Sequence, residues 1–251
     1  MNILLSNDDG IEADGLKALA KVLGKEHNVF VCAPLKEQSG MAHALSVHRP
    51  MELVVYEDYE KLYKVRAWAL DGTPTDCVKM FLESLVNEFS LPQMDLVIAG
   101  INHGANLATD VIYSGTVGAA IEGYLHDINS LAVSLDVNSI YNYEEIAFLI
   151  KENINKLIAI SDSPVLLNIN IPIEFSTRPP KFSYGLLGKR DYVNAYIKED
   201  SAGKTFYTVA GEILDTDTEL NTDLNIIKNG EISVTPLDTD MTNYALLKNK
   251  I

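Results

Sequence analysis

Residues 2–23, NILLSNDDGIEADGLKALAKVL, contain the first repeat of the pattern on which the fold prediction rests. The apolar run at residues 2–6 is typical of a short buried strand. Apolar side chains in residues 15–23 recur at helical spacing, at Leu16, Leu19, Ala20 and Leu23. A polar turn containing Asp8 and Asp9 separates the two elements, so the chain opens with a strand, a turn and a helix.

The same alternation continues to about residue 172. Further strands are predicted at residues 28–33, 51–56, 63–70, 95–99, 131–135 and 165–171. Helices are predicted from residue 74, at residues 116–125 and at residues 143–160. Near-continuous apolar strands that alternate with helices indicate a mostly parallel sheet with helices on both faces. The predicted fold class is therefore α/β.

The helix that begins near residue 74 has a clear start signal. Thr73 is a typical N-cap residue, Pro74 suits the first helical position, and Asp76 completes a T-x-x-D capping box. These residues place the start of the helix without reference to the apolar pattern.

The pattern changes from about residue 178. Short alternating runs, TFYTVAG and EISVTPL, lie between charged and Asn-rich turns and predict hairpins. We therefore expect two parts, residues 1–177 with the parallel sheet and residues 178–251 with a hairpin-containing C-terminal segment.

Composition excludes several classes of protein. The 251 residues include 20 Lys and Arg against 35 Asp and Glu, a formal net charge of −15. That balance argues against a nucleic-acid polymer as partner, because such binding needs many basic side chains. Only two cysteines are present, which disfavours a disulfide framework or a zinc site. No apolar run near the start is long enough for a signal peptide or membrane span, so we expect a cytoplasmic protein without a membrane partner.

Polar loops follow three of the predicted strands. In an open parallel sheet, ligands bind beyond the carboxyl ends of the strands. The loops at these ends are residues 7–10, residues 39–40 and residues 100–104, and they supply mainly hard oxygen donors. Oxygen donors of this kind suit Mg²⁺ or Mn²⁺ better than zinc.

The adjacent Asp8 and Asp9 can be interpreted in two ways. In an extended strand they would point to opposite faces, but Gly10 permits a turn that lets both reach one ion. A surface turn before a helix accounts for the same residues, since aspartates favour a helix N-terminus. These residues alone support both interpretations equally.

Residues 100–123, GINHGANLATDVIYSGTVGAAIEG, follow a predicted buried strand and enter a helix through Ser114, Gly115 and Thr116. A helix start with free N–H groups and two hydroxyls is a site that can hold phosphate. Capping statistics alone favour a simpler role, in which Ser114 only caps the helix. The phosphate interpretation gains support because Asn102 and the aspartate pair lie at the same sheet edge.

Five segments of the chain, taken together, carry a resemblance to a known family: NDDGIEADG, EQSGMAHALS, DGTPTDCV, GINHGANLATDVIYSGTVGAAIEG and NTDLNIIKNGEISVTPLDTDMT. They resemble the SurE family, the survival-protein 5′-nucleotidases. The resemblance implies a Rossmann-like domain and a metal-dependent phosphatase that hydrolyses nucleoside monophosphates. It also implies a C-terminal segment used in forming a homodimer or homotetramer. The preference for 5′- over 3′-monophosphates and any action on short polyphosphates stay open.

The resemblance also implies roles for particular residues. One divalent ion per subunit, Mg²⁺ or Mn²⁺, would be held by Asp8, Asp9, Ser39 and Asn102. Phosphate would contact Asn106, Ser114, Gly115 and Thr116, with Gly40 near the substrate. Asp8 or Asp9 would either activate a water molecule or attack phosphorus directly. The chain departs from the family at Ala108-Thr109 and at Asn221, which puts the local loop shape in question.

Other interpretations account for less of the chain. A response-regulator receiver domain also places an acidic pair after its first strand, but no clear phosphoacceptor aspartate follows the strand near residue 55. A dinucleotide-binding oxidoreductase would need G-x-G-x-x-G after the first strand, and that motif is missing. His43, His48 and His103 could supply a general acid, although a loop histidine is more often a polar contact.

Overall fold

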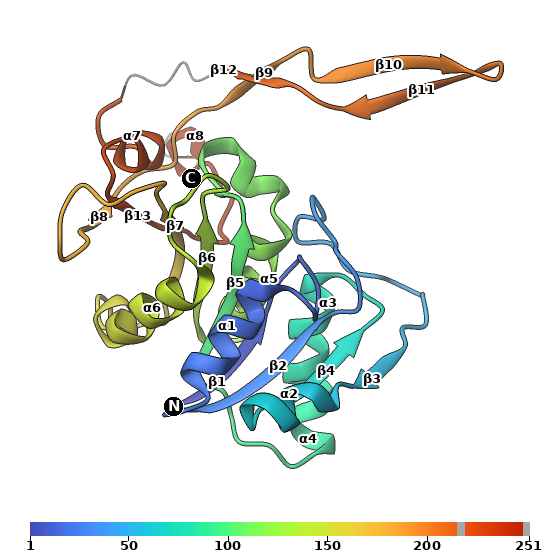
Figure 1. Cartoon of the computed structure of the whole chain (residues 1–251), viewed down its shortest axis with the longest axis vertical. Coiled ribbons are helices and arrows are strands. Elements are labelled where there is room, and N and C mark those ends of the chain that lie inside the picture. Colours follow the sequence, from blue (N-terminus) through green and yellow to red (C-terminus); the bar gives the residue numbers. More distant parts are fainter. Residues whose placement is uncertain (215–218, 248–251) are drawn as a thin grey trace.

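The computed structural model describes residues 1–214 and 219–247. Its centre is a nine-stranded sheet with the order β3-β4-β2-β1-β5-β6-β7-β13-β8 (Figure 1). The strands are β1 (Asn2–Ser6), β2 (Asn28–Pro34), β3 (Leu53–Val55), β4 (Arg66–Leu70), β5 (Leu96–His103), β6 (Asn129–Leu135), β7 (Leu166–Ile171), β8 (Phe182–Tyr184) and β13 (Ile232–Pro236). The six strands from β4 to β7 are mutually parallel, which confirms the predicted α/β class.

Helices cover both faces of this sheet. They are α1 (Asp14–Leu23), α2 (Glu57–Tyr63), α3 (Pro74–Met80), α4 (Val86–Glu88), α5 (Gly115–Leu125), α6 (Tyr143–Ile158), α7 (Asp223–Lys228) and α8 (Tyr244–Leu247), with a π-helical turn at Phe81–Leu85 and a 3₁₀ helix at Ala108–Tyr113. Alternate residues of β1 enter different cores: Ile3 and Leu5 pack with α1 and α6, whereas Leu4 packs with α3 and α5. Both faces of the strand are therefore buried, as its continuous apolar run predicted.

Two helix starts agree with their sequence signals. Thr73 accepts a hydrogen bond from the Asp76 backbone, and the Asp76 carboxylate accepts one from the Thr73 backbone, which is the predicted capping box. Ser114 caps α5 and accepts a hydrogen bond from the Val117 backbone at 3.1 Å.

The structure corrects the predicted strands at 51–56 and 63–70. They shorten to β3 and β4, and the short helix α2 separates them. Tyr59 is the one fully buried residue of α2, and its hydroxyl donates to the Ile11 carbonyl at 2.7 Å. A helix with one buried residue has no apolar stripe, so periodicity could not reveal it.

The C-terminal segment divides into two kinds of structure. Strands β10 (Tyr196–Ser201) and β11 (Lys204–Val209) form the predicted hairpin, which extends from the body beside the pair β9 (Asp191–Val193) and β12 (Glu212–Leu214) (Figure 1). The predicted hairpin at EISVTPL is wrong. Those residues form β13, which lies in the central sheet between β7 and β8.

The alternation in β13 was misleading because both of its faces are covered: Ser233 and Thr235 are buried as completely as Ile232 and Val234. The boundary at residues 177/178 stays a prediction, and β8 and β13 beyond it hydrogen-bond into the sheet. Residues 215–218 and 248–251 of the predicted C-terminal segment lie outside the described residues. Within the described part of the chain, no helix has the length and apolar character to cross a bilayer.

Candidate functional site

The turn after β1 is closed by Asn7. This fully buried side chain donates to the Gly10 carbonyl at 2.9 Å and accepts from the Gly10 backbone at 3.2 Å. Gly10 has φ of +97°, a conformation that side chains with a Cβ rarely adopt. In the sheet, β1 lies between β2 and β5, and the strand order reverses at this point. The turn lies beyond the carboxyl end of β1, which is the usual ligand position in an open α/β sheet.

Asp8 lies beneath the start of α5. Its side chain is 5% exposed, and its Oδ1 accepts a hydrogen bond from the Thr116 hydroxyl. A Cβ on Gly115 would lie only 2.9 Å from the Asp8 Cβ, so only glycine fits there without movement. Burial raises the pKa of Asp8 to about 6; the charge of Asp9 adds to the rise, and the Thr116 hydrogen bond opposes it. A bound cation would stabilise the ionised form of such a buried carboxylate, so Asp8 is a candidate cation ligand.

Asp9 connects the same turn to the end of β5. Its Oδ2 accepts a hydrogen bond from the His103 backbone at 3.2 Å. Asp9 is only partly buried, and burial raises its pKa, with the nearby Glu37 adding to the rise. The adjacent Asn102 donates its amide nitrogen to the Gly104 carbonyl at 2.7 Å, which leaves the amide oxygen for a cation. The structure thus brings the ends of β1 and β5 together, as the strand-end argument predicted.

The loop after β2 begins against Asp8. The Gln38 backbone donates to the Asp8 carbonyl at 2.7 Å. Ser39 is exposed, and its hydroxyl donates to Glu37 at 2.7 Å. Gly40 has φ of +74° and open space around it. The loop backbone is therefore at the site, whereas a contact of Ser39 with a cation or of Gly40 with substrate stays a prediction.

Asn106 is held from the two neighbouring strands. Its side-chain amide donates to Ser134 of β6 at 2.8 Å, and its backbone donates to Asn170 of β7 at 2.7 Å. The Asn168 amide donates to the Asn106 carbonyl at 2.8 Å. Sequence reasoning missed this support, because Asn168 and Asn170 lie in the apolar run VLLNINI. Their i, i+2 spacing, which puts both amides on one face, was the available signal.

The comparisons decide the family. Residues 3–194 match the family model described as survival protein SurE. The chain belongs to the SurE family. It is 41% identical to a protein of Pelotomaculum thermopropionicum named 5′-nucleotidase SurE, over 99% of this chain and 93% of that one. It is 40% identical to the protein of that name from Caldanaerobacter subterraneus, over 98% and 95% of the two chains.

A solved structure supports the same assignment. The crystal structure of the SurE protein from Aquifex aeolicus aligns with a TM-score of 0.81 and 34% identity. The alignment covers 100% of this chain and 98% of that one. The agreement therefore includes the C-terminal segment as well as the parallel sheet.

Residues 108–109 and 221–223, the two expected departures from the family pattern, lie together. The Ala108 backbone donates to Asp223 of α7 at 2.7 Å, and the Thr109 hydroxyl donates to the Arg190 carbonyl at 2.8 Å. Asp110 accepts hydrogen bonds from Arg190 at 2.9 Å and from the Tyr192 hydroxyl at 2.7 Å. Sequence reasoning did not foresee these hydrogen bonds between the C-terminal segment and residues 108–110.

The predicted ligands fit a divalent cation of the Mg²⁺ or Mn²⁺ kind. Asp8, Asp9, Ser39 and Asn102 supply carboxylate, hydroxyl and amide oxygens, the donors that such ions prefer. The buried Asp8 carboxylate provides the charge to be neutralised. Ser114, Gly115 and Thr116 are buried at the adjacent helix start.

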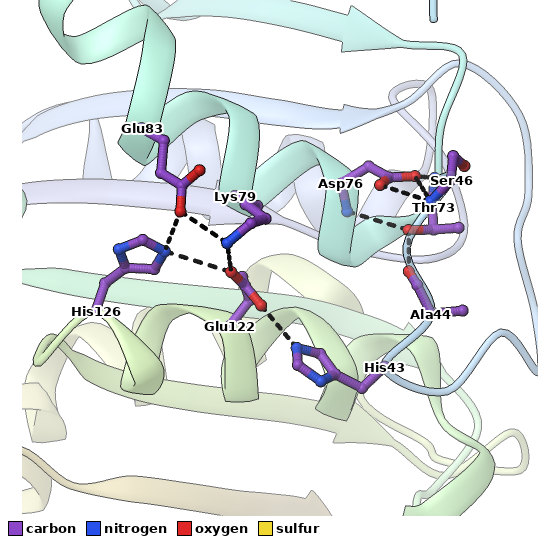
Figure 2. Close-up of polar contacts among 9 residues, drawn as sticks. All are labelled: His43, Ala44, Ser46, Thr73, Asp76, Lys79, Glu83, Glu122 and His126. Carbon is purple, nitrogen blue, oxygen red and sulfur yellow. Dashed lines mark hydrogen bonds and ion pairs between the residues drawn. The ribbon is translucent and has the colours of Figure 1, made fainter. Parts of the chain in front are cut away.

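A different acidic cluster in the SurE fold is already neutralised. Glu83, Glu122 and His126 place potential ligand atoms within 4.8 Å of one another (Figure 2). Lys79 lies among them, with its Nζ 2.7 Å from Glu83 and 3.1 Å from Glu122. The ammonium group supplies the positive charge there, so this cluster is an ion-pair network.

Proposed function

We propose that the protein is a divalent-metal-dependent phosphatase that hydrolyses nucleoside 5′-monophosphates to nucleoside and phosphate. The observation that carries the proposal is the contact between buried Asp8 and the first turn of α5. It brings an anionic cation-binding group beside a helix start that can bind phosphate. The relatives named 5′-nucleotidase SurE supply the substrate class.

The residues divide the work between charge and position. Asp8, Asp9, Ser39 and Asn102 would hold one Mg²⁺ or Mn²⁺, which supplies neutralisation of phosphate charge when bound. The N–H groups at the start of α5, near Ser114, Gly115 and Thr116, bind the remaining phosphate oxygens. These donors stabilise the charge that develops during the reaction. Asn106, held from β6 and β7, is the remaining proposed phosphate contact, and the loop that follows it leads to this helix.

The two aspartates have different surroundings and, in this proposal, different tasks. Asp8 is buried and already accepts a hydrogen bond from Thr116, so it binds the cation. Asp9 is more open to solvent and orients the attacking water. A single turnover in ¹⁸O-labelled water and borohydride trapping of the enzyme together separate this route from direct attack by a carboxylate. Label in an aspartate, or an Asp8 or Asp9 reduced by borohydride during turnover, reveals an acyl phosphate and contradicts water attack. Label in the phosphate with neither of these supports water attack.

Phosphate release tests the activity. We expect release from AMP and from p-nitrophenyl phosphate with Mg²⁺ or Mn²⁺, and its loss with EDTA. Release that chelation leaves unchanged would contradict the proposed metal dependence. A panel of 5′-monophosphates, 3′-monophosphates and short polyphosphates then establishes the substrate range.

We propose that the protein forms a homodimer or homotetramer through its C-terminal segment. All residues of β10 and β11 are exposed, although an isolated two-stranded hairpin is at best marginally stable in water. Ile197 and Phe206 form a smaller apolar group on one face of the hairpin, and Tyr196, Tyr207 and Val209 form a larger one on the other face, because directly paired and alternate residues share a face. A second copy of this chain would cover that face.

We also propose that the protein is located in the cytoplasm. The free thiols of Cys32 and Cys77 are consistent with this reducing compartment.

A further inference from the structure

The loop at residues 38–46 joins the two halves of the candidate site. It begins at the Asp8 carbonyl, to which Gln38 donates, and the Ala42 backbone donates to the Tyr113 carbonyl at 3.0 Å. Tyr113 directly precedes the cap of α5. The loop therefore runs from the cation-binding turn to the phosphate-binding helix, with Ser39 and Gly40 between the two attachments.

The far end of this 38–46 loop is attached to α3. The Thr73 hydroxyl donates to the Ala44 carbonyl at 2.7 Å, and the Ser46 backbone donates to the Asp76 carboxylate at 3.0 Å (Figure 2). The capping box of α3 thus has a second use, because the residues that start the helix also hold the loop.

Between these attachments, the loop contacts the side of α5. A Cβ on Gly118 would lie 2.2 Å from the Ala42 carbonyl oxygen and 3.1 Å from the His43 Cα. Backbone meets backbone here, and only glycine permits the approach. Ala42 has φ of +53°, an uncommon conformation that tertiary contacts must maintain.

One side-chain contact holds the loop at this place. His43 Nε2 lies 2.7 Å from Oε2 of Glu122, which is 3% exposed and about two turns along α5 from Ser114 (Figure 2). Lys79 and His126 contact the other oxygen, Oε1, at 3.1 and 3.3 Å. The Lys79 ammonium group therefore neutralises Glu122 at Oε1, and Oε2 binds the loop through His43.

We infer that His43, held by Glu122, is a positioning residue that keeps the segment with Ser39 and Gly40 between the cation- and phosphate-binding groups. The inference rests on the proposed function, and His43 acts through the loop without touching substrate. Without the contact, the exposed segment regains conformational freedom and its groups are placed less accurately. Small displacements of positioned groups are known to cost large factors in rate.

Four proteins test the inference: wild type, His43→Ala, His43→Gln and His126→Ala. The amide nitrogen of glutamine can replace Nε2 of histidine, so His43→Gln keeps the contact. His126→Ala is the matched control, because it removes a histidine from the same Glu122 without touching the loop. The readouts are kcat and KM for AMP with Mn²⁺, hydrogen exchange of residues 38–46, and the melting temperature.

We expect His43→Ala to lower kcat/KM about tenfold, because a small misplacement of the loop groups costs a factor of this order or more in rate. We also expect faster exchange at the Ala42 amide and a modest fall in melting temperature, because Glu122 loses one hydrogen-bond partner but keeps its contacts with Lys79 and His126. His43→Gln should recover most of the rate and the protection. His126→Ala should resemble wild type in both.

Two results would overturn the inference. One is normal kinetics and exchange in His43→Ala, and the other is an equal loss in His126→Ala, which would indicate a general effect on the ion-pair network. If wild type releases no phosphate, the proposed function fails instead. Hydrogen exchange still decides in that case whether His43 anchors the loop.

Discussion

The Thr116 hydroxyl donates a hydrogen bond to Oδ1 of Asp8, which lies 108 residues earlier in the chain. This bond joins the turn after β1 to the first turn of α5. It keeps the acidic group and the helix start in one place before any ligand binds. Arrangement in advance of this kind is what electrostatic stabilisation of a charged transition state requires.

Replacing Thr116 tests the importance of that bond. We expect Thr116→Val to lower kcat/KM by about ten- to a hundredfold, because the buried Asp8 carboxylate loses its hydroxyl donor. Thr116→Ser keeps the hydroxyl and is the matched control, with activity near that of wild type. Steady-state kinetics with AMP and Mn²⁺ measure both. Equal activity in the valine and serine variants would show that the bond is dispensable.

Asp8→Asn should separate activity from stability. We expect metal-dependent phosphate release to fall at least a hundredfold, while the metal-free protein becomes more stable at pH 7.5. The pKa of Asp8 is about 6 in the folded protein and 3.8 in the unfolded chain. The free energy of unfolding therefore falls as pH rises from 3.8 to about 6, because the buried carboxylate must ionise. The gain should be on the order of 2 kcal/mol.

Urea unfolding with EDTA measures that gain, and the shift in melting temperature on adding Mn²⁺ measures cation binding. Asp162→Asn, at an exposed position, is the control and should change neither. A metal-free Asp8→Asn protein less stable than wild type would contradict the argument about buried charge.

Glu122 should produce the opposite dependence on pH. Burial alone would raise its pKa, but hydrogen bonds from His43 and Lys79 outweigh burial and lower the pKa to about 2. The ionised carboxylate therefore stabilises the fold above the unfolded value of 4.5, and this contribution is lost as pH falls from there toward 2. We expect Glu122→Gln to cost on the order of 2 kcal/mol at pH 7, with the difference shrinking below pH 4.5.

Urea unfolding between pH 7 and pH 3 measures this dependence. Glu144→Gln removes an exposed carboxylate that pairs with Lys21, and it should cost less than about 1 kcal/mol. A cost for Glu122→Gln that stays constant over the pH range would show that the cause is packing and not charge.

The hairpin variant Tyr207→Glu with Val209→Glu should reduce the oligomer to monomer. Both side chains are on the face with Tyr196, where two added charges would oppose burial against a second copy. Thr208→Glu places one charge on the opposite face and is the control. Sedimentation velocity gives the mass of each protein. A monomeric wild type would contradict the proposed role of the C-terminal segment.

The regular part of the fold could be predicted because its signals are local. Apolar runs, helical spacing and the caps at Thr73 and Ser114 each depend on neighbours within a few residues, and the structure agrees with them. The prediction was wrong for α2, which buries a single large side chain. It was wrong for β13 because a strand with alternating residues can still be covered on both faces.

The candidate site was only partly accessible to the same reasoning. Asp8, Asp9 and Asn102 could be brought together from sequence, since parallel strands end at one edge of the sheet. The contacts of Glu122 with His43 and of Asp223 with Ala108 span 79 and 115 residues. Nothing in the local sequence around either acid indicates its partner.

The sequence by itself determined the family, the alternation of strands and helices from β1 to β7 apart from α2, and the kinds of atoms at the ends of β1 and β5. Only the tertiary structure decided that the Asp8 carboxylate is buried beneath α5 and that His43 ties the 38–46 loop to Glu122. The physical reason is range. Propensity, capping and periodicity act between near neighbours, whereas burial, pKa and the choice of hydrogen-bond partner depend on segments that meet only when the sheet has formed.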